Sequence, residues 1–363
     1  MIRRRTVACI LLGVLAQACG DSAGGTPAES DGGPGAPAEG GGGALPDSGA
    51  SETQPDGGSN DGGPVGLTAQ QVKAATTTAT TNAACTSIMP FYWEIGDKGS
   101  SLASGSLKGS GSTTYTASSE MAIASASKWL YSTYWVQRTA GVLSGSDVKF
   151  FNFWSGYTNF SSCAGSTTVG NCLDLANKDG VTNGTFDPAT ENKFDYGGGH
   201  MQKHAALNGL AALDSQQLAT EIASQLGTDI KVAYGQPQLA GGANMSAGEY
   251  GKMLRKIVGG QLTMKTVLGT HPVCVDPASC PEALNTPSPK GEKWHYSVGH
   301  WVEDDPTVGD GAFSSPGAFG FYPWIDQSKS LYGIVARASA AGAISSVKCG
   351  RLIRKAWVTG VAQ

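Results

Sequence analysis

A serine and a lysine that stand three residues apart are the strongest chemical signal in this sequence. Ser125-Ala126-Ser127-Lys128 opens a stretch with helical periodicity, so the hydroxyl and the amine project from the same side of one turn. A serine hydroxyl attacks an acyl carbon at neutral pH only when a neighbouring group takes its proton. The spacing makes Ser125 a candidate nucleophile and Lys128 its candidate base, although an ordinary helix-start serine explains the spacing alone more often.

Two other serines, Ser146 and Ser345, also stand three residues before a lysine, and their contexts differ. Ser146 follows a glycine and is typical of a turn or a helix cap. Ser345 begins a basic C-terminal segment that we interpret as a solvated helix. Only Ser125 precedes a long apolar stripe, and the first turn of a buried helix adds the positive end of the helix dipole. Sequence context thus favours Ser125 over the other two.

The first eighteen residues have the pattern of a secretory signal peptide. Three arginines at positions 3–5 precede an apolar run over residues 7–16, which is too short for a lasting membrane span. Ala16-Gln17-Ala18 is an ordinary cleavage site, whereas Cys19 stands where bacterial lipoproteins carry their lipid. We expect an exported protein of the bacterial cell envelope that is anchored in the membrane through Cys19, with plain secretion as the alternative.

Residues 19–66 are expected to form a disordered tether, because Gly, Pro, Ser, Ala and acidic residues dominate the segment. The tether holds eight acidic and no basic residues, and the signal peptide holds three arginines and no acid. The chain holds 25 basic and 29 acidic residues, so 22 basic and 21 acidic residues remain outside these two segments. A near-neutral domain without a basic stripe argues against a nucleic-acid partner.

Six cysteines fall in the domain that we expect over residues 67–363. An exported chain meets an oxidising compartment and contains no C-x-x-C pair, so disulfides are favoured over zinc, although fifteen pairings are open. The short loops between Cys163 and Cys172 and between Cys274 and Cys280 make these two the most favoured pairs. Elimination leaves Cys85 with Cys349.

Strand patterns occur early and late in this domain, with helical patterns between them. We therefore predict an α+β fold in which an antiparallel sheet (residues 67–120 and 287–363), flanked by N- and C-terminal helices, is interrupted by a mostly helical part (residues 121–286). The expected strands are Phe91–Gly96, Ser101–Gly109, Trp294–Glu303, Ala318–Ile325 and Ser330–Arg337. The expected helices are Ala69–Met89, one from Ser125 to about Thr139, Gln202–Leu213, Ser215–Leu226, Ser246–Val258 and Ser345–Trp357.

This order of elements, with the Ser125–Lys128 tetrad at the first junction from sheet to helix, resembles the serine β-lactamase and penicillin-binding protein superfamily. The likeness is strongest to its class C-like branch of esterases and D-peptidases. The family's second motif is Tyr-x-Asn, where this chain has Tyr196 and, in place of the Asn, Gly198. The third is Lys-Thr-Gly or His-x-Gly, where this chain has Ser315 and Gly317.

The resemblance implies a serine hydrolase that forms an acyl-enzyme on a small-molecule or peptide substrate, without a cofactor. Ser125 would be the nucleophile and Lys128 its proton acceptor, while Tyr196 shuttles the proton once the Lys128 ammonium has lowered its pKa. The amides of Ser125 and Ala318 would hold the oxyanion, and Gly317 would let the substrate lie close to the backbone.

The two departures from the motifs bear on the substrate. Ser315 offers a hydroxyl where a cation would pair with a substrate carboxylate, and Gly198 lacks an amide for a substrate acylamide. Both favour an ester or a neutral amide over a β-lactam. The residues His300, Trp301 and Trp324 are further candidates to line the pocket, with plain core packing as the alternative.

Two other classes of function stay open at this stage. The chain could be a non-catalytic lipoprotein that binds the cell envelope on the same fold. A zinc site on His200 and His204 is disfavoured, because Met201 stands where the H-E-x-x-H motif has its glutamate.

Overall fold

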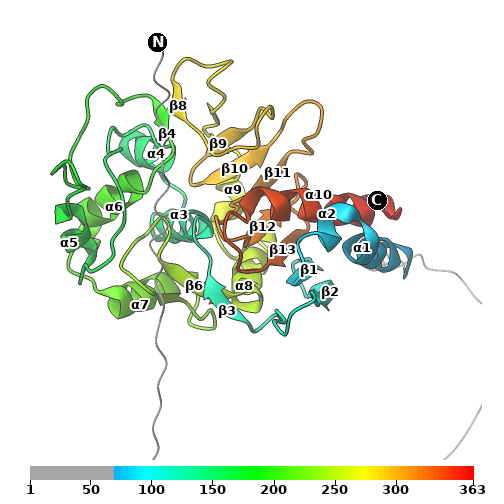
Figure 1. The fold of residues 1–363 in the computed structure, drawn as a ribbon. Coiled ribbons are helices and arrows are strands. Elements are labelled where there is room, and N and C mark those ends of the chain that lie inside the picture. Colours follow the sequence, from blue (N-terminus) through cyan, green and yellow to red (C-terminus); the bar gives the residue numbers. More distant parts are fainter. Residues whose placement is uncertain (1–68) are drawn as a thin grey trace, which may run out of the picture. The chain divides into compact units, whose positions relative to one another are not determined.

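An eight-stranded sheet is the largest element of the computed structural model, which describes residues 69–363. Its strand order is β2-β1-β13-β12-β11-β10-β9-β7, and every neighbouring pair is antiparallel (Figure 1). The strands are β1 (Phe91–Gly96), β2 (Ser101–Leu107), β7 (Val273–Cys274), β9 (His295–Ser297), β10 (His300–Glu303), β11 (Ala312–Ser314), β12 (Tyr322–Ile325) and β13 (Tyr332–Ala336).

Helices cover both faces of the central strands. Alternate residues of β13 point to opposite faces, and its Ile334 lies against Gly251 of α8 (Ala247–Val258), whereas Val335 lies against Gly350 of α10 (Ala343–Thr359). All residues of β1, β12 and β13 are buried, as expected for strands that are packed on both sides. The predicted α+β architecture is confirmed.

The N- and C-terminal helices pack together beside the sheet. Helix α1 (Ala69–Thr81) and helix α2 (Ala83–Thr86) both contact α10 (Figure 1). A disulfide between Cys85 and Cys349 joins α2 to α10. It closes a loop with a sequence separation of 264 residues, which the chain-entropy model values at up to ~5 kcal/mol.

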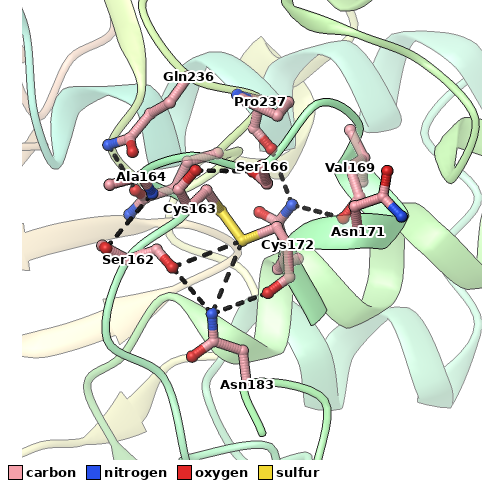
Figure 2. Close-up of a disulfide and its surroundings, with 12 residues drawn as sticks. Ser162, Cys163, Ala164, Ser166, Val169, Asn171, Cys172, Asn183, Gln236 and Pro237 are labelled. Atoms are coloured by element: carbon pink, nitrogen blue, oxygen red, sulfur yellow. Dashed lines mark hydrogen bonds between the residues drawn. A yellow bond between two sulfur atoms is a disulfide. The ribbon is translucent and has the colours of Figure 1, made fainter. Parts of the chain in front are cut away.

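All three expected disulfides are present, and the one between Cys163 and Cys172 tethers a loop of the helical part. Figure 2 shows the Asn183 side chain beside this bond. The buried Asn183 amide donates to the carbonyl oxygens of Ser162 at 2.9 Å and Cys172 at 2.8 Å. These bonds and the disulfide fix the loop that leads into α5 (Val169–Asp174).

The helical part surrounds α3 (Ala126–Arg138), in which every residue from Ala126 to Val136 is buried. The remaining elements are α4 (Gly145–Phe151), α6 (Gly199–Ala205), a π-helix (Ala206–Leu210), α7 (Ser215–Leu226) and α9 (Met264–Val267), with two small sheets made of β3 (Glu120–Ala122), β6 (Ala243–Ser246) and β5 (Ala233–Tyr234), and of β4 (Phe194–Asp195) and β8 (Ala283–Asn285). None of the helices within residues 69–363 is long and apolar enough to cross a bilayer.

The structure corrects several sequence-based boundaries. The single strand expected over Trp294–Glu303 is a hairpin of β9 and β10, because Val298 (φ 38°) and Gly299 (φ 80°) form a turn in the left-handed region. The helix expected over Ala69–Met89 divides at Asn82, whose side chain caps α2. Strand β7 lies inside residues 121–286 and yet is the last strand of the large sheet.

The C-terminal segment is not a solvated helix, because α10 buries Arg354 to 2 % exposure. Arg354 lies between Glu303 at 3.0 Å and Asp310 at 2.6 Å, and paired charges of this kind can be buried. The predicted signal peptide, Cys19 and the tether lie outside the described residues.

Candidate active site

Ser125 lies at the point where the chain turns from β3 into α3. Ala124, the residue before it, has a φ of 44°. A residue with a side chain is uncommon in this region, and the conformation costs on the order of 1–3 kcal/mol. Ser125 is the N-cap of α3, and its own hydroxyl makes no capping bond. The Ser125 hydroxyl is therefore not engaged by the backbone N–H groups of the first turn of α3.

Lys128 reaches back over one helical turn to this hydroxyl. Its Nζ donates to Ser125 Oγ at 3.1 Å and to the carbonyl oxygen of Ala240 at 2.9 Å. The Lys128 side chain is 5 % exposed, and burial lowers its pKa from 10.5 to about 7. Near neutral pH a large fraction of Lys128 is therefore the free amine, which can accept a proton.

Tyr196 lies on the other side of the pair, just after β4. The Lys128 Nζ lies 4.6 Å from the centre of the Tyr196 ring. Burial raises the pKa of Tyr196 to about 12, while hydrogen bonds with Ser125 and Trp301 act in the opposite direction. The sequence predicts that the Lys128 ammonium lowers the pKa of Tyr196, whereas in the structure burial is the largest influence and raises it. With a pKa of about 12 Tyr196 is a phenol at neutral pH, whereas Lys128, with a pKa of about 7, is partly a free amine.

A cavity of about 360 Å³ opens beside these groups. Ser125, Tyr196 and Ala318 are part of its wall, and the other lining residues are Pro287, Trp294, Trp301, Pro316, Ala341, Ala343 and Ile344. The backbone amides of Ser125 and Ala318 donate no hydrogen bond to any of residues 69–363. Both residues line the cavity, and backbone N–H groups without a protein partner are the kind of donor that can stabilise an oxyanion.

Ser315 and Gly317 lie near the site, but their roles differ from those expected of substrate-binding residues. Ser315 is 2 % exposed, and its hydroxyl donates to the carbonyl oxygen of Ser125 at 3.0 Å. This bond ties the segment before Ala318 to the turn that carries Ser125. A Cβ at position 317 would come within 2.2 Å of the Ile123 carbonyl oxygen, so Gly317 is required by packing within the protein.

Gly198 and His300 do not line the cavity. A Cβ at position 198 would lie 2.5 Å from the ring of Phe160, which thus occupies the place of a side chain there. His300 is fully buried, its Nε2 accepts from the Gly269 amide at 3.1 Å, and its ring stacks on Trp129. The expectation that His300 binds substrate is wrong, because its side chain is packed in the core.

Of the aromatic residues that the sequence suggested for the pocket, Trp301 lines the cavity, whereas the buried Trp324 does not. Sequence reasoning missed Trp294 as a wall residue and the Ala240 carbonyl as a partner of Lys128. Every residue carries a backbone carbonyl group, so the sequence holds no signal for the contact between Lys128 and the Ala240 carbonyl.

The two histidines at i and i+4 bind different protein groups. His200 contacts the Ser155 hydroxyl at 2.7 Å and the Asp195 carbonyl at 3.0 Å, and burial lowers its pKa to about 4. His204 contacts the Tyr131 hydroxyl at 2.7 Å and Asp147 at 2.9 Å. Within residues 69–363 no cluster of three or more His, Cys, Asp or Glu could hold a metal ion.

The described part of the chain has the fold of serine β-lactamases and penicillin-binding proteins. A protein assigned as a β-lactamase from Bacteroides dorei DSM 17855 has a TM-score of 0.54 and 18% identity, over 74% of this chain and 93% of that one. The octameric penicillin-binding protein homologue from Pyrococcus abyssi has a TM-score of 0.52 and 13% identity, over 75% and 74%. A penicillin-binding protein from Bacillus halodurans has a TM-score of 0.50 and 12% identity, over 71% and 94%. No protein-family model and no curated protein matches the sequence. At these identities the likeness shows the fold alone.

Proposed function

We propose that this chain is a serine hydrolase that cleaves uncharged esters or amides through an acyl-enzyme on Ser125. The observation that carries the proposal is the bond from the Lys128 amine to Ser125 Oγ, at the wall of a cavity that also includes Tyr196. A hydroxyl hydrogen-bonded to a group with a pKa of about 7 is the arrangement that activates a serine.

The acylation step follows from these contacts. The neutral Lys128 amine takes the proton of Ser125 as Oγ attacks the substrate carbonyl carbon, and the amides of Ser125 and Ala318 stabilise the negative oxygen. Tyr196 then donates its phenolic proton to the leaving oxygen or nitrogen as the acyl bond breaks, and the Lys128 ammonium returns a proton to Tyr196. The products are the acyl-enzyme and a neutral alcohol or amine.

Deacylation uses the same groups in the opposite direction. A water molecule gives up a proton to the Lys128 relay and attacks the acyl carbon, and the released Ser125 oxygen is reprotonated. The free acid leaves, and the enzyme returns to its starting protonation state. No cofactor is needed for any of these steps.

The preference for an uncharged substrate rests on the wall of the cavity. Among residues 69–363, that wall includes no Lys, Arg or His that could pair with a carboxylate. The Ser315 hydroxyl already donates to the protein, and Phe160 occupies the position beside Gly198. At both positions that depart from the family motifs, Ser315 and Gly198, contacts within the protein thus take the place of contacts with a substrate.

The place of action is also part of the proposal. Three disulfides in the described domain support folding in an oxidising compartment. Together with the leader pattern they favour export, with residues 1–18 as signal peptide, residues 19–66 as tether and a lipid on Cys19.

A fluorescent alkyl fluorophosphonate tests the proposed function, because this class of probe forms a covalent bond only with an activated serine. We expect the wild-type protein to be labelled and the Ser125→Ala variant to remain unlabelled. Equal labelling of both would place the reactive group elsewhere. No labelling of either, with an intact fold, would favour a non-catalytic binding protein.

A further inference from the structure

The wall of the cavity is apolar apart from the catalytic groups. Besides Ser125 and Tyr196, all eight lining residues are Trp, Pro, Ala or Ile. Such a wall gains free energy when it covers apolar surface, and it offers a charged substrate group no partner to replace its hydration. The wall therefore favours a group that is uncharged and largely hydrocarbon.

Two largely buried tryptophans are part of this wall. The rings of Trp294 and Trp301 have centroids 5.6 Å apart and an interplanar angle of 68°. Trp301 also stacks on Tyr196 at 5.3 Å with an angle of 28°, so its ring is continuous with a catalytic group. Aromatic rings prefer such edge-to-face and stacked neighbours, and a third ring in the cavity would add a contact of the same kind.

The Trp294 ring is held in place from the side of α10. Its Nε1 donates to Glu292 at 2.9 Å, and the Arg351 guanidinium lies 5.0 Å from the ring centre. Arg351 in turn binds Glu292 at 2.7 Å and Glu303 at 2.9 Å. The N–H of Trp294 is already satisfied and the residue is only 2 % exposed, so its ring is fixed by packing where it borders the cavity.

The cavity is large enough to hold one aromatic ring. At about 360 Å³ it is roughly twice the ~150 Å³ cavity that accommodates one benzene molecule. It therefore has room for a single aromatic ring with a short linker and the reacting carbonyl, together with a small leaving group.

We propose that the acyl group of the substrate is an uncharged arylacyl group of one ring, such as phenylacetyl, which binds against Trp294 and Trp301, and that Trp294 determines this specificity. This inference rests on the proposed hydrolase function. It adds the class of acyl group and a specificity residue outside the catalytic set.

Methyl esters test the inference, because methanol is too small to occupy the cavity and the acyl group is then the only large part. Hydrolysis is followed by acid release in a pH-stat for methyl acetate, methyl phenylacetate, methyl cyclohexylacetate and methyl (4-carboxyphenyl)acetate. We expect kcat/KM for phenylacetate to exceed that for acetate by roughly 10- to 100-fold, the value of burying one phenyl group. The cyclohexyl ester should fall below the phenyl ester, and the carboxylated ester should lose the gain entirely.

A size exchange at Trp294 links the preference to this residue. Trp294→Phe leaves a smaller ring, so the ratio of kcat/KM for methyl 2-naphthylacetate to that for methyl phenylacetate should rise at least fivefold over wild type. Trp294→Ala should raise the ratio further where it folds. Trp135→Phe, a matched change at a buried tryptophan of α3 outside the cavity wall, should leave the ratio unchanged.

Three results separate this inference from the function on which it rests. Hydrolysis of methyl acetate without a phenyl preference, in a protein labelled at Ser125, would overturn the arylacyl site and leave the hydrolase intact. A phenyl preference that Trp294→Phe does not shift toward the naphthyl ester would remove Trp294 as its determinant. Absence of both ester hydrolysis and Ser125 labelling would contradict the function and the inference together.

Discussion

Replacement of Lys128 by methionine should change how the stability of the fold depends on pH. Burial lowers the pKa of Lys128 from 10.5 to about 7, so between these values the unfolded chain binds more protons than the folded one. The stability of the wild type therefore rises with pH across this window. Below pH 7 the full cost of the buried ammonium is present, about 5 kcal/mol for a shift of this size.

The variant lacks this titrating group, so only the wild type carries the cost. From the two pKa values of Lys128, the buried amine lowers the free energy of unfolding of the wild type by about 5 kcal/mol at pH 6 and by about 2 kcal/mol at pH 9. The difference in free energy of unfolding, variant minus wild type, should thus be about 3 kcal/mol larger at pH 6 than at pH 9. Methionine also removes the hydrogen bonds to Ser125 and Ala240. Their loss shifts the free-energy difference at pH 6 and the one at pH 9 in the same direction.

Urea unfolding, followed by tryptophan fluorescence with the disulfides intact, measures this difference. The coincidence of fluorescence and circular dichroism transitions checks two-state behaviour. Lys355→Met removes an exposed lysine of α10 and serves as the control, with little expected change at either pH. A Lys128→Met effect that is the same at pH 6 and pH 9 would refute the argument that burial makes Lys128 a base.

Three further predictions concern activity and packing. The rate constant kcat/KM on a neutral ester should rise with pH through an apparent pKa near 7, because Lys128 must be neutral to accept the Ser125 proton; a flat profile from pH 5.5 to 8.5 would contradict this role. Tyr196→Phe and Lys128→Ala should each lower kcat on the order of 10²–10⁴-fold. The double variant should be little worse than either single variant, because both residues belong to one relay. If steady-state kinetics instead show that the two losses multiply, the residues act independently. Gly317→Ala should lower the melting temperature and activity together, because its Cβ would collide with the Ile123 carbonyl oxygen; a fully stable and active variant would show that this segment moves freely.

The sequence allowed a large part of the fold and of the catalytic set to be predicted. Ser125 and Lys128 are local partners on one helical turn, so their spacing alone brings them together. Tyr196 is distant in the chain, and only the resemblance of its motif could connect it with them. The disulfide between Cys85 and Cys349 followed by elimination because the other four cysteines bracket short loops.

What the sequence did not reveal depends on tertiary packing. The low pKa of Lys128 arises from its burial, and no pattern near residue 128 records the distant elements that pack around it. The inward placement of His300 and the bond from Ser315 to Ser125 likewise depend on elements far apart in the chain. The hairpin of β9 and β10 escaped prediction because its turn places Val298, a β-branched residue, at positive φ.

The acyl-enzyme on Ser125 can be observed by mass spectrometry of the protein quenched in acid during turnover of methyl phenylacetate. We expect a mass increase equal to one phenylacetyl group, located by peptide mapping on Ser125 and absent from the Ser125→Ala variant. A protein that hydrolyses the ester while Ser125→Ala retains full activity would contradict the mechanism.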